Sequence, residues 1–189
     1  MVMRGKEFNI CSIGRPCYQK NTKFLIEIAK SVVERIPSIK FYLLGVGYYS
    51  PDLDEVKVLI DKYSLCENFE LVEWLPQHEI FDYIDQADIY VSTSLYEGLP
   101  LSVIEVMSMS RPIIASDVVG NRDCVFEGEN GYLLPFDKEQ FVAKIIELYN
   151  DDKRREGMGR RSRELFLEHF HIETQADKLK QIYKDIANK

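Results

Sequence analysis

Short hydrophobic runs alternate with amphipathic segments along most of the chain. Residues 8–13 alternate in polarity, include β-branched side chains and stop at Gly14, which predicts a strand. Apolar positions at three-to-four spacing in residues 21–36 predict a helix that ends before Pro37. Residues 41–44 are nearly continuously apolar, which is typical of a parallel strand covered on both faces. The chain therefore opens with a strand, a helix and a second strand.

The same alternation continues to about residue 149. Hydrophobic runs predict further strands at residues 69–72, 89–91, 112–115 and 132–134. Helical spacing predicts helices at residues 53–63, at 80–84, from about 101, and at 138–149. This order favours an α/β fold, a Rossmann-like doubly wound parallel sheet of about six strands, which binds ligands at the carboxyl ends of its strands.

We expect a single domain, because 189 residues leave no room for a second full one. Residues 1–150 would form the Rossmann-like core. Residues 151–189 would add C-terminal helices, at about 153–170 and 173–187.

Composition and charge exclude several classes of function. Lys and Arg total 24 against 31 Asp and Glu, a net charge of -7, so no global basic field favours nucleic acid. No apolar stretch approaches the ~20 residues that span a bilayer, and the N-terminus does not resemble a signal peptide, so we expect a cytoplasmic protein. The four cysteines lie far apart without C-x-x-C spacing, which predicts reduced, mostly structural thiols and no zinc site.

The densest polar motif is S-T-S-L-Y-E-G-L-P-L-S-V-I-E, residues 92–105, between a predicted strand and helix. Free backbone N–H groups at the start of that helix form a ready phosphate site; they belong to Leu101, Ser102 and Val103. Glu97 and Glu105 bracket this anion site, and carboxylates suit sugar hydroxyls. A plain helix-capping loop with a Glu that favours the helix dipole is the alternative.

Two cations follow the first predicted strand. Arg15 and Lys20 lie five positions apart in a loop at the same sheet edge and could converge on one diphosphate. Each charge-assisted hydrogen bond there would contribute ~1.5–3 kcal/mol. The alternative is a solvated loop before a helix capped by Asn21 or Thr22.

Together these motifs resemble the nucleotide-sugar-binding domain of retaining glycosyltransferases of family 4, also called group 1, which have the GT-B fold. Glu97 and Glu105 form an E-x7-E pattern preceded by A-D-I-Y-V-S-T-S. The other matching segments, in the same order, are I-G-R followed by Lys20, L-G-V-G at 44–47, R-P-I-I-A at 111–115, E-N-G at 129–131 and the tail 151–170. The resemblance extends over nearly the whole chain.

The resemblance implies roles for individual residues. Arg15 and Lys20 would hold the donor diphosphate and, with Glu97, form the catalytic set. Glu97 and the amides of Leu99 to Leu101 would face the donor sugar, and Glu105 would bind the ribose hydroxyls. The remaining donor-binding residues would be Gly14, Gly47, Gly98, Pro100 and Ser102.

Two departures from the family pattern affect this site. Pro100 replaces the commoner Gly of the loop, which affects local amide geometry. The V-G-G segment lacks its second Gly, so Asn121 or Arg122 becomes a candidate for donor recognition.

The resemblance also implies the function. The chain would be the donor-binding domain of an enzyme that transfers a hexose-type sugar from a UDP- or GDP-sugar to a glycan or lipid-linked acceptor, in surface polysaccharide biosynthesis. No metal and no cofactor are expected. The N-terminal acceptor domain of the same enzyme would be absent, so the domain alone would be inactive. The whole enzyme would be cytoplasmic, with peripheral contact at the inner face of the membrane.

Two other functions fit the same motifs. One is a sugar-nucleotide 2-epimerase-like protein with the GT-B fold, which would need acid and base groups that these motifs do not show. The other is a non-catalytic nucleotide-binding module that regulates a partner.

Three weaker patterns remain. Trp74 is expected in the core, with stacking on a base as the alternative. The basic residues of 153–163 are interleaved with Glu156, so a solvated helix face is favoured over a lipid contact. In the last helix Leu179, Ile182, Tyr183 and Ile186 form an apolar stripe. The stripe packs on its own domain or, because the last helix of GT-B enzymes crosses back to the N-terminal domain, is left partly exposed or packs against a neighbouring chain.

Overall fold

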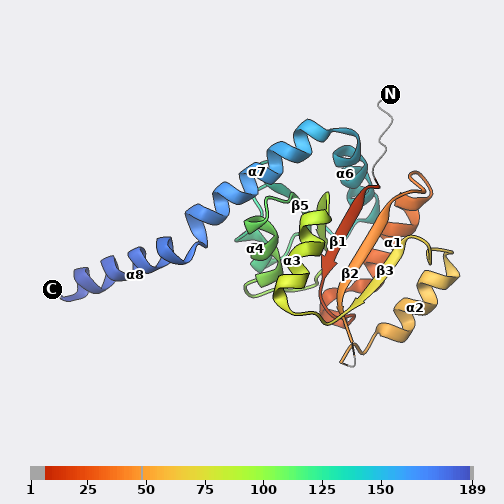
Figure 1. The fold of residues 1–189 in the computed structure, drawn as a ribbon, viewed down its shortest axis with the longest axis horizontal. Helices are drawn as coiled ribbons and strands as arrows, with labels where there is room; N and C mark the ends of the chain where they lie inside the picture. The colour runs from red at the N-terminus through yellow and green to blue at the C-terminus, as the bar shows by residue number, and fades with distance from the viewer. Residues whose placement is uncertain (1–6, 48, 188–189) are drawn as a thin grey trace.

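The computed structural model describes residues 7–47 and 49–187, and in this part of the chain six parallel strands form one sheet (Figure 1). Their order across the sheet is β3-β2-β1-β4-β5-β6. The strands are β1 (Asn9–Ile13), β2 (Lys40–Val46), β3 (Phe69–Glu73), β4 (Ile89–Ser92), β5 (Ile113–Ser116) and β6 (Gly131–Leu134). The doubly wound α/β fold predicted from the sequence is confirmed.

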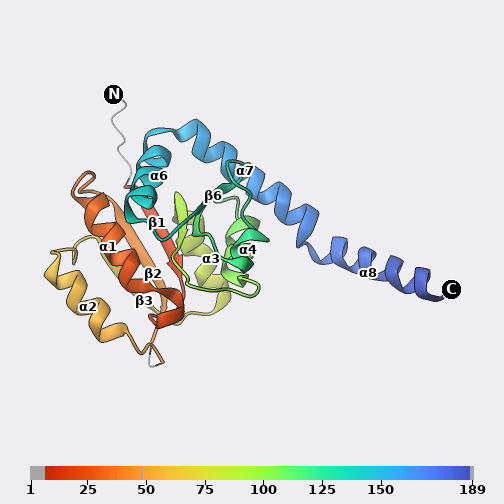
Figure 2. The same ribbon diagram turned by 180° about the vertical axis from the view of Figure 1, so that it is seen from behind.

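Helices cover both faces of this sheet. The helices of the described residues are α1 (Thr22–Val33), α2 (Leu53–Lys62), α3 (Gln77–Gln86), α4 (Leu101–Ser108), α5 (Val119–Arg122), α6 (Lys138–Asn150), α7 (Asp152–His169) and α8 (Ile172–Ala187), of which α8 does not cover the sheet. One core joins the sheet to α1, α2 and α6, and a second joins it to α3, α4 and α7. Figure 1 looks onto α3 and α4, and Figure 2 onto α1 from behind.

The sequence pattern missed or shortened a few elements. The 3-10 helix η1 (Tyr18–Lys20) and helix α5 are too short to show a hydrophobic period. Helix α3 spans ten residues, more than the predicted range 80–84, and Pro76 occupies its N-cap position. The sequence pattern found only part of this helix because apolar side chains lie on its inner face alone. These short elements lie at loops that belong to the site.

The cysteines are free thiols in the described part of the chain. Burial raises the pKa of Cys11 to about 12, and burial also raises the pKa of Cys124 to about 12. Both thiols therefore stay protonated at neutral pH and pack as small apolar side chains.

Helix α7 packs directly against the turn between α4 and β5. Arg163 donates a hydrogen bond from Nη1 to the carbonyl oxygen of Ser108 at 2.9 Å. Arg155 is largely buried, and its Nε lies 3.6 Å from Oδ1 of Asp88. Burial lowers the pKa of Arg155. The prediction of a solvated basic face is therefore wrong for Arg155, which binds α7 to the sheet.

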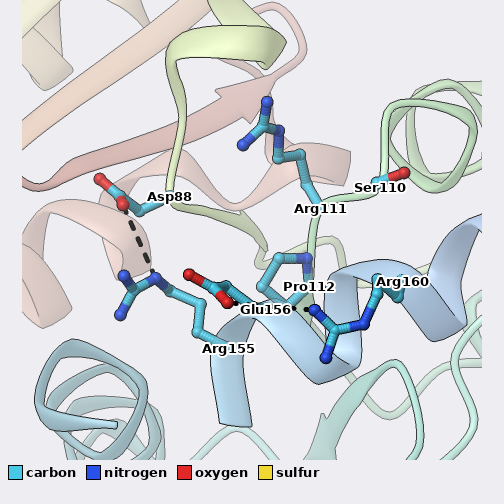
Figure 3. Close-up of a pocket in the computed structure, with 7 residues that line it drawn as sticks. All are labelled: Asp88, Ser110, Arg111, Pro112, Arg155, Glu156 and Arg160. Carbon is cyan, nitrogen blue, oxygen red and sulfur yellow. Dashed lines mark ion pairs between the residues drawn. The ribbon is translucent and has the colours of Figure 1, made fainter. Parts of the chain in front are cut away.

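The pocket beside this contact lies at the amino edge of the sheet (Figure 3). It has a volume of about 310 Å³ and lies between Asp88, before β4, and Pro112, before β5. Its arginines already have carboxylate partners: Arg111 with Asp85, Arg155 with Asp88 and Arg160 with Glu156. Paired guanidinium groups leave little charge for a ligand, so this pocket is part of the packing of α7.

The last helix extends away from the rest of the domain. Figures 1 and 2 both show α8 projecting beyond α7. Its apolar stripe is half or more exposed, with Leu179 at 50% and Tyr183 at 64%. The alternative in which the stripe packs on its own domain is therefore wrong. None of the helices in the described residues is long and apolar enough to cross a membrane.

Two glycines of α7 test how tightly this helix packs. A Cβ at Gly159 would lie 2.3 Å from the carbonyl oxygen of Ser110. Gly159→Ala is expected to lower the free energy of unfolding by ~1–3 kcal/mol, because the helix must move off the turn. At Gly157 the nearest atom is 3.9 Å away. Gly157→Ala is expected to raise that free energy by about 0.5–1 kcal/mol through helix propensity.

Denaturant unfolding of both variants measures these changes. Equal effects of the two substitutions would contradict the close packing of α7 on the turn.

Candidate functional site

The site lies where the carboxyl ends of β1 and β4 meet. These strands are neighbours in the sheet although their loops are far apart in sequence. Backbone and side-chain hydrogen bonds join the two loops: Leu95 N donates to Gln19 O at 2.8 Å, and Thr93 Oγ1 donates to Lys20 O at 3.0 Å. The loop with the two cations and the loop with Glu97 therefore form one surface.

An ion pair connects these loops at their centre. Lys20 Nζ lies 2.6 Å from Glu97 Oε1, and the side chains are 24% and 8% exposed. The carbon stem of Lys20 passes over Gly14, where a Cβ would lie 2.8 Å from Lys20 Cε. Gly14 also has φ +150, so it is required both for the backbone turn and for the path of the lysine.

Arg15 lies in a different part of the same edge. It is exposed and lines a pocket of about 280 Å³ together with Gly45, Gly47 and Trp74, among others. Arg15 forms no ion pair within residues 7–47 and 49–187. The structure thus gives the two cations different surroundings, Lys20 beside Glu97 and Arg15 beside Trp74.

Trp74 is 79% exposed, so the prediction that it lies in the core is wrong. It directly follows the last residue of β3, an edge strand, where no helix covers it. An exposed indole beside Arg15 is the arrangement that stacks on a planar ligand.

Glu105 lies on α4. Its Oε1 accepts a hydrogen bond from Gln77 Nε2 at 2.7 Å, a partner that the sequence did not indicate. Gln77 is the first residue of α3, so the contact depends on how α3 and α4 are placed. One carboxylate oxygen of Glu105 is thereby oriented by the protein, and the other can accept from a ligand.

The start of α4 presents fewer free amides than the sequence predicted. Val103 N donates to Pro100 O at 3.0 Å, so its amide is not available. The amides of Leu101 and Ser102 have no acceptor in the described part of the chain. Pro100 has no amide hydrogen, so in residues 99–101 only Leu99 and Leu101 have a backbone amide that can donate. The helix N-terminus therefore offers Leu101 and Ser102 to an anion.

Ser102 is also tied to the core. Its Oγ accepts a hydrogen bond from the hydroxyl of Tyr90 at 3.0 Å. Burial raises the pKa of Tyr90 well above its usual value, so the hydroxyl stays neutral and donates.

The segment after β5, which includes α5, contacts the Glu97 loop. Gly120 N donates to Glu97 O at 3.2 Å, and a Cβ at Gly120 would lie 2.5 Å from Gly98 O. Asn121 is fully buried and donates from Nδ2 to Ser116 O at 2.9 Å. Arg122 Nε lies 2.6 Å from Asp117 Oδ1. Asn121 thus holds the backbone at the end of β5 through Nδ2, while its Oδ1 has no hydrogen-bond partner among the described residues, and Arg122 is already paired.

The described residues contain no group of three or more His, Cys, Asp or Glu side chains placed to hold a metal ion. The groups that the structure gathers at this edge are two cations, two carboxylates, an indole and backbone amides.

Comparison with known proteins gives a family match over most of the chain. The family model described as glycosyl transferases group 1 matches residues 2–165. An Escherichia coli UDP-Gal:alpha-D-GlcNAc-diphosphoundecaprenol alpha-1,3-galactosyltransferase is 30% identical over 98% of this chain and 47% of its own length. A Staphylococcus aureus poly(ribitol-phosphate) alpha-N-acetylglucosaminyltransferase is 32% identical over 88% of this chain and 33% of its own. The chain spans about half, or less, of the length of these relatives.

Solved structures show the same fold. A mutant of S. aureus TarM, in complex with Fondaparinux, alpha-GlcNAc-glycerol and UDP, superposes with a TM-score of 0.82 at 28% identity. The match covers 93% of this chain and 35% of that one. Anabaena Alr3699/HepE in complex with UDP gives a TM-score of 0.86 at 17% identity, over 95% of this chain and 49% of that one, which shows the fold alone.

The contact between the β5 loop and the Glu97 loop can be tested with two glycines. Gly120→Ala is expected to lower the free energy of unfolding by ~1–3 kcal/mol, because its Cβ meets backbone oxygens that cannot move independently. Gly98→Ala is the control, since its Cβ meets no atom within 4 Å and should change stability by less than about 0.5 kcal/mol. Thermal or denaturant unfolding measures both, and a neutral Gly120→Ala would refute the contact.

Proposed function

Because the chain belongs to the group 1 glycosyl transferases, we propose that it is the donor-binding half of a retaining glycosyltransferase with the GT-B fold. The donor is a UDP- or GDP-activated hexose-type sugar, and the acceptor is a glycan or lipid-linked glycan of a surface polysaccharide. The observation that carries this proposal is the joined pair of loops after β1 and β4, which bring Lys20 and Glu97 within 2.6 Å at the ligand-binding edge of the sheet.

The proposed division of work follows from the chemistry of the side chains. Arg15 and Lys20 bind the diphosphate, and they favour the transition state because negative charge grows on the departing diphosphate. The free amides of Leu101 and Ser102 donate to the same anion. Glu97 accepts hydrogen bonds from the donor sugar, while Glu105, oriented by Gln77, accepts from the ribose.

The pocket of Arg15 and Trp74 is proposed to receive the nucleoside. Its walls include Gly45 and Gly47, which let a flat ligand approach the backbone at the end of β2. The E. coli relative carries UDP-Gal in its name, and the TarM structure contains UDP. These names favour a uridine donor over a guanosine donor here.

The exposed stripe of α8 is proposed to pack on another part of the whole enzyme, the half that binds the acceptor. The relatives are about twice as long as this chain or longer, and the four side chains of the apolar stripe of α8 are half or more exposed. The chain alone would then bind the donor without transferring its sugar. The whole enzyme would act at the cytoplasmic face of the membrane, where lipid-linked acceptors are reached.

The diphosphate role of Arg15 can be tested by calorimetry with UDP and GDP at millimolar concentration. Arg15→Ala is expected to weaken binding about 10- to 100-fold, because one charge-assisted contact is lost. Arg35→Ala is the control. Arg35 is exposed, lies outside the site, and its Nη2 is 3.7 Å from Oε2 of Glu139. A folded wild-type chain that binds neither nucleotide would refute the proposed function.

The nucleoside pocket offers an independent test, because Trp74 is the single tryptophan of the sequence. Binding of UDP is expected to change its fluorescence. Trp74→Phe should retain most of the affinity, whereas Trp74→Ala should lose about 5- to 100-fold, the usual effect of removing an aromatic stack on a base. Neither substitution should lower stability by more than about 0.5 kcal/mol, because the side chain is exposed. Unchanged affinity of Trp74→Ala would place the base elsewhere.

A further inference from the structure

The Glu97 loop, which lies between β4 and α4, is held from two sides. Towards η1, its residues Thr93 and Leu95 donate hydrogen bonds to the carbonyl oxygens of Lys20 and Gln19, at 3.0 and 2.8 Å. Towards β5 and α5, carbonyl oxygens of the loop accept hydrogen bonds. The position of Glu97 therefore depends on β5 and α5 as well as on the loop after β1.

Ser116, the last residue of β5, makes one of the contacts on this second side. Its hydroxyl donates to Ser94 O at 2.5 Å, three residues before Glu97. Both partners are buried, Ser116 with 0% and Ser94 with 1% of its surface exposed. Because bulk water has little access to this carbonyl oxygen, the hydroxyl of Ser116 is the donor that satisfies it.

Asn121 orients the hydroxyl of Ser116. Its Nδ2 donates to Ser116 O at 2.9 Å and, more distantly, to Ser116 Oγ at 3.5 Å. A hydroxyl oxygen that accepts from an amide directs its own hydrogen to another acceptor, which here is Ser94 O. Asn121 directly follows Gly120, whose backbone N donates to Glu97 O at 3.2 Å. The end of β5 and α5 together thus fix the Glu97 loop at two points.

The carboxylate of Glu97 has little freedom of its own. Its side chain is 8% exposed, and Oε1 lies 2.6 Å from Lys20 Nζ, so the carboxylate follows the movement of its backbone. A hydrogen bond to a sugar hydroxyl depends steeply on distance and angle, and a shift of that backbone weakens it. The groups proposed for the diphosphate lie on other segments, the loop after β1 and the start of α4.

We propose that Ser116, with its hydroxyl oriented by Asn121, is a positioning residue for the donor sugar. It acts through the carbonyl of Ser94, which fixes the loop and so the carboxylate of Glu97. This inference rests on the proposed function and deepens the account of the same site. Ser116 and Asn121 are fully buried, so they act on the ligand only through the Glu97 loop. Ser116 then sets the affinity for the sugar and leaves the affinity for the nucleoside diphosphate nearly unchanged.

The test measures a ratio of two affinities of the 189-residue chain, the affinity for a sugar nucleotide divided by that for UDP. The probes are UDP and whichever of UDP-glucose, UDP-galactose and UDP-N-acetylglucosamine wild type binds best in calorimetry. Ser116→Ala is expected to lower this ratio about 3- to 10-fold, because the Glu97 loop loses one of its fixed points. The affinity for UDP itself should stay within about twofold of wild type.

The matched control is Ser162→Ala. Ser162 is also fully buried, and its hydroxyl donates to Asn130 O at 3.4 Å, on α7 and outside the site. Both alanine variants lose a buried hydroxyl, so a general loss of stability affects them alike, and denaturant unfolding measures it. In Ser162→Ala the ratio of affinities should stay within about twofold of wild type.

A double-mutant cycle with Glu97→Ala shows whether Ser116 acts through Glu97. Glu97→Ala alone is expected to lower the ratio about tenfold or more, because the charged acceptor of the sugar is lost. In that background Ser116→Ala should lower the ratio by less than about twofold, since no carboxylate remains to be positioned. Additive losses would overturn the inference, and so would a Ser116→Ala variant whose ratio equals that of Ser162→Ala.

The outcomes separate this inference from the proposed function. If Glu97→Ala lowers the ratio and Ser116→Ala does not, the donor site stands and the positioning role of Ser116 fails. If Glu97→Ala leaves the ratio unchanged, Glu97 does not bind the sugar, and the positioning role fails with it. A folded wild-type chain that binds no UDP, GDP or sugar nucleotide would overturn the proposed function itself.

Discussion

The arrangement of the site depends on one constraint, the position of β1 between β2 and β4 in a wholly parallel sheet. Parallel pairing puts the carboxyl ends of these strands at one edge, and the chain reverses its direction of winding at β1. Lys20 and Glu97 are 77 positions apart in sequence, yet they meet because their loops leave neighbouring strands. Arg15, Trp74 and the start of α4 join them at the same edge for the same reason.

The electrostatics of the site are local and do not follow from the charge of the chain. The net charge of -7 opposes the binding of anions, whereas this edge of the sheet gathers Arg15, Lys20 and free amides at a helix start. Carboxylates lie beside these groups, and each already has a partner: Glu97 with Lys20 and Glu105 with Gln77. A ligand that contacted either carboxylate would therefore compete with the partner that the carboxylate already has.

The sequence by itself determined the fold class and the family, and it named the candidate residues of the site. Buried parallel strands need apolar side chains on both faces, so their runs are readable, and the E-x7-E segment with its flanking motifs identified the family. The sequence could not show short elements such as η1 and α5, because three or four residues carry no period. It also placed Trp74 in the core, since an aromatic after a strand looks alike whether or not a helix covers it.

Only the tertiary structure decided which groups meet. The pairing of Lys20 with Glu97 and of Gln77 with Glu105 depends on strand order and helix placement, which act between residues far apart in the chain. The same holds for burial: Asn121 lies inside and the stripe of α8 outside, although local composition suggested otherwise. The local pattern of apolar and polar residues determines whether a segment forms a helix or a strand. Contacts across the sheet determine which side chains are buried and which partners they meet.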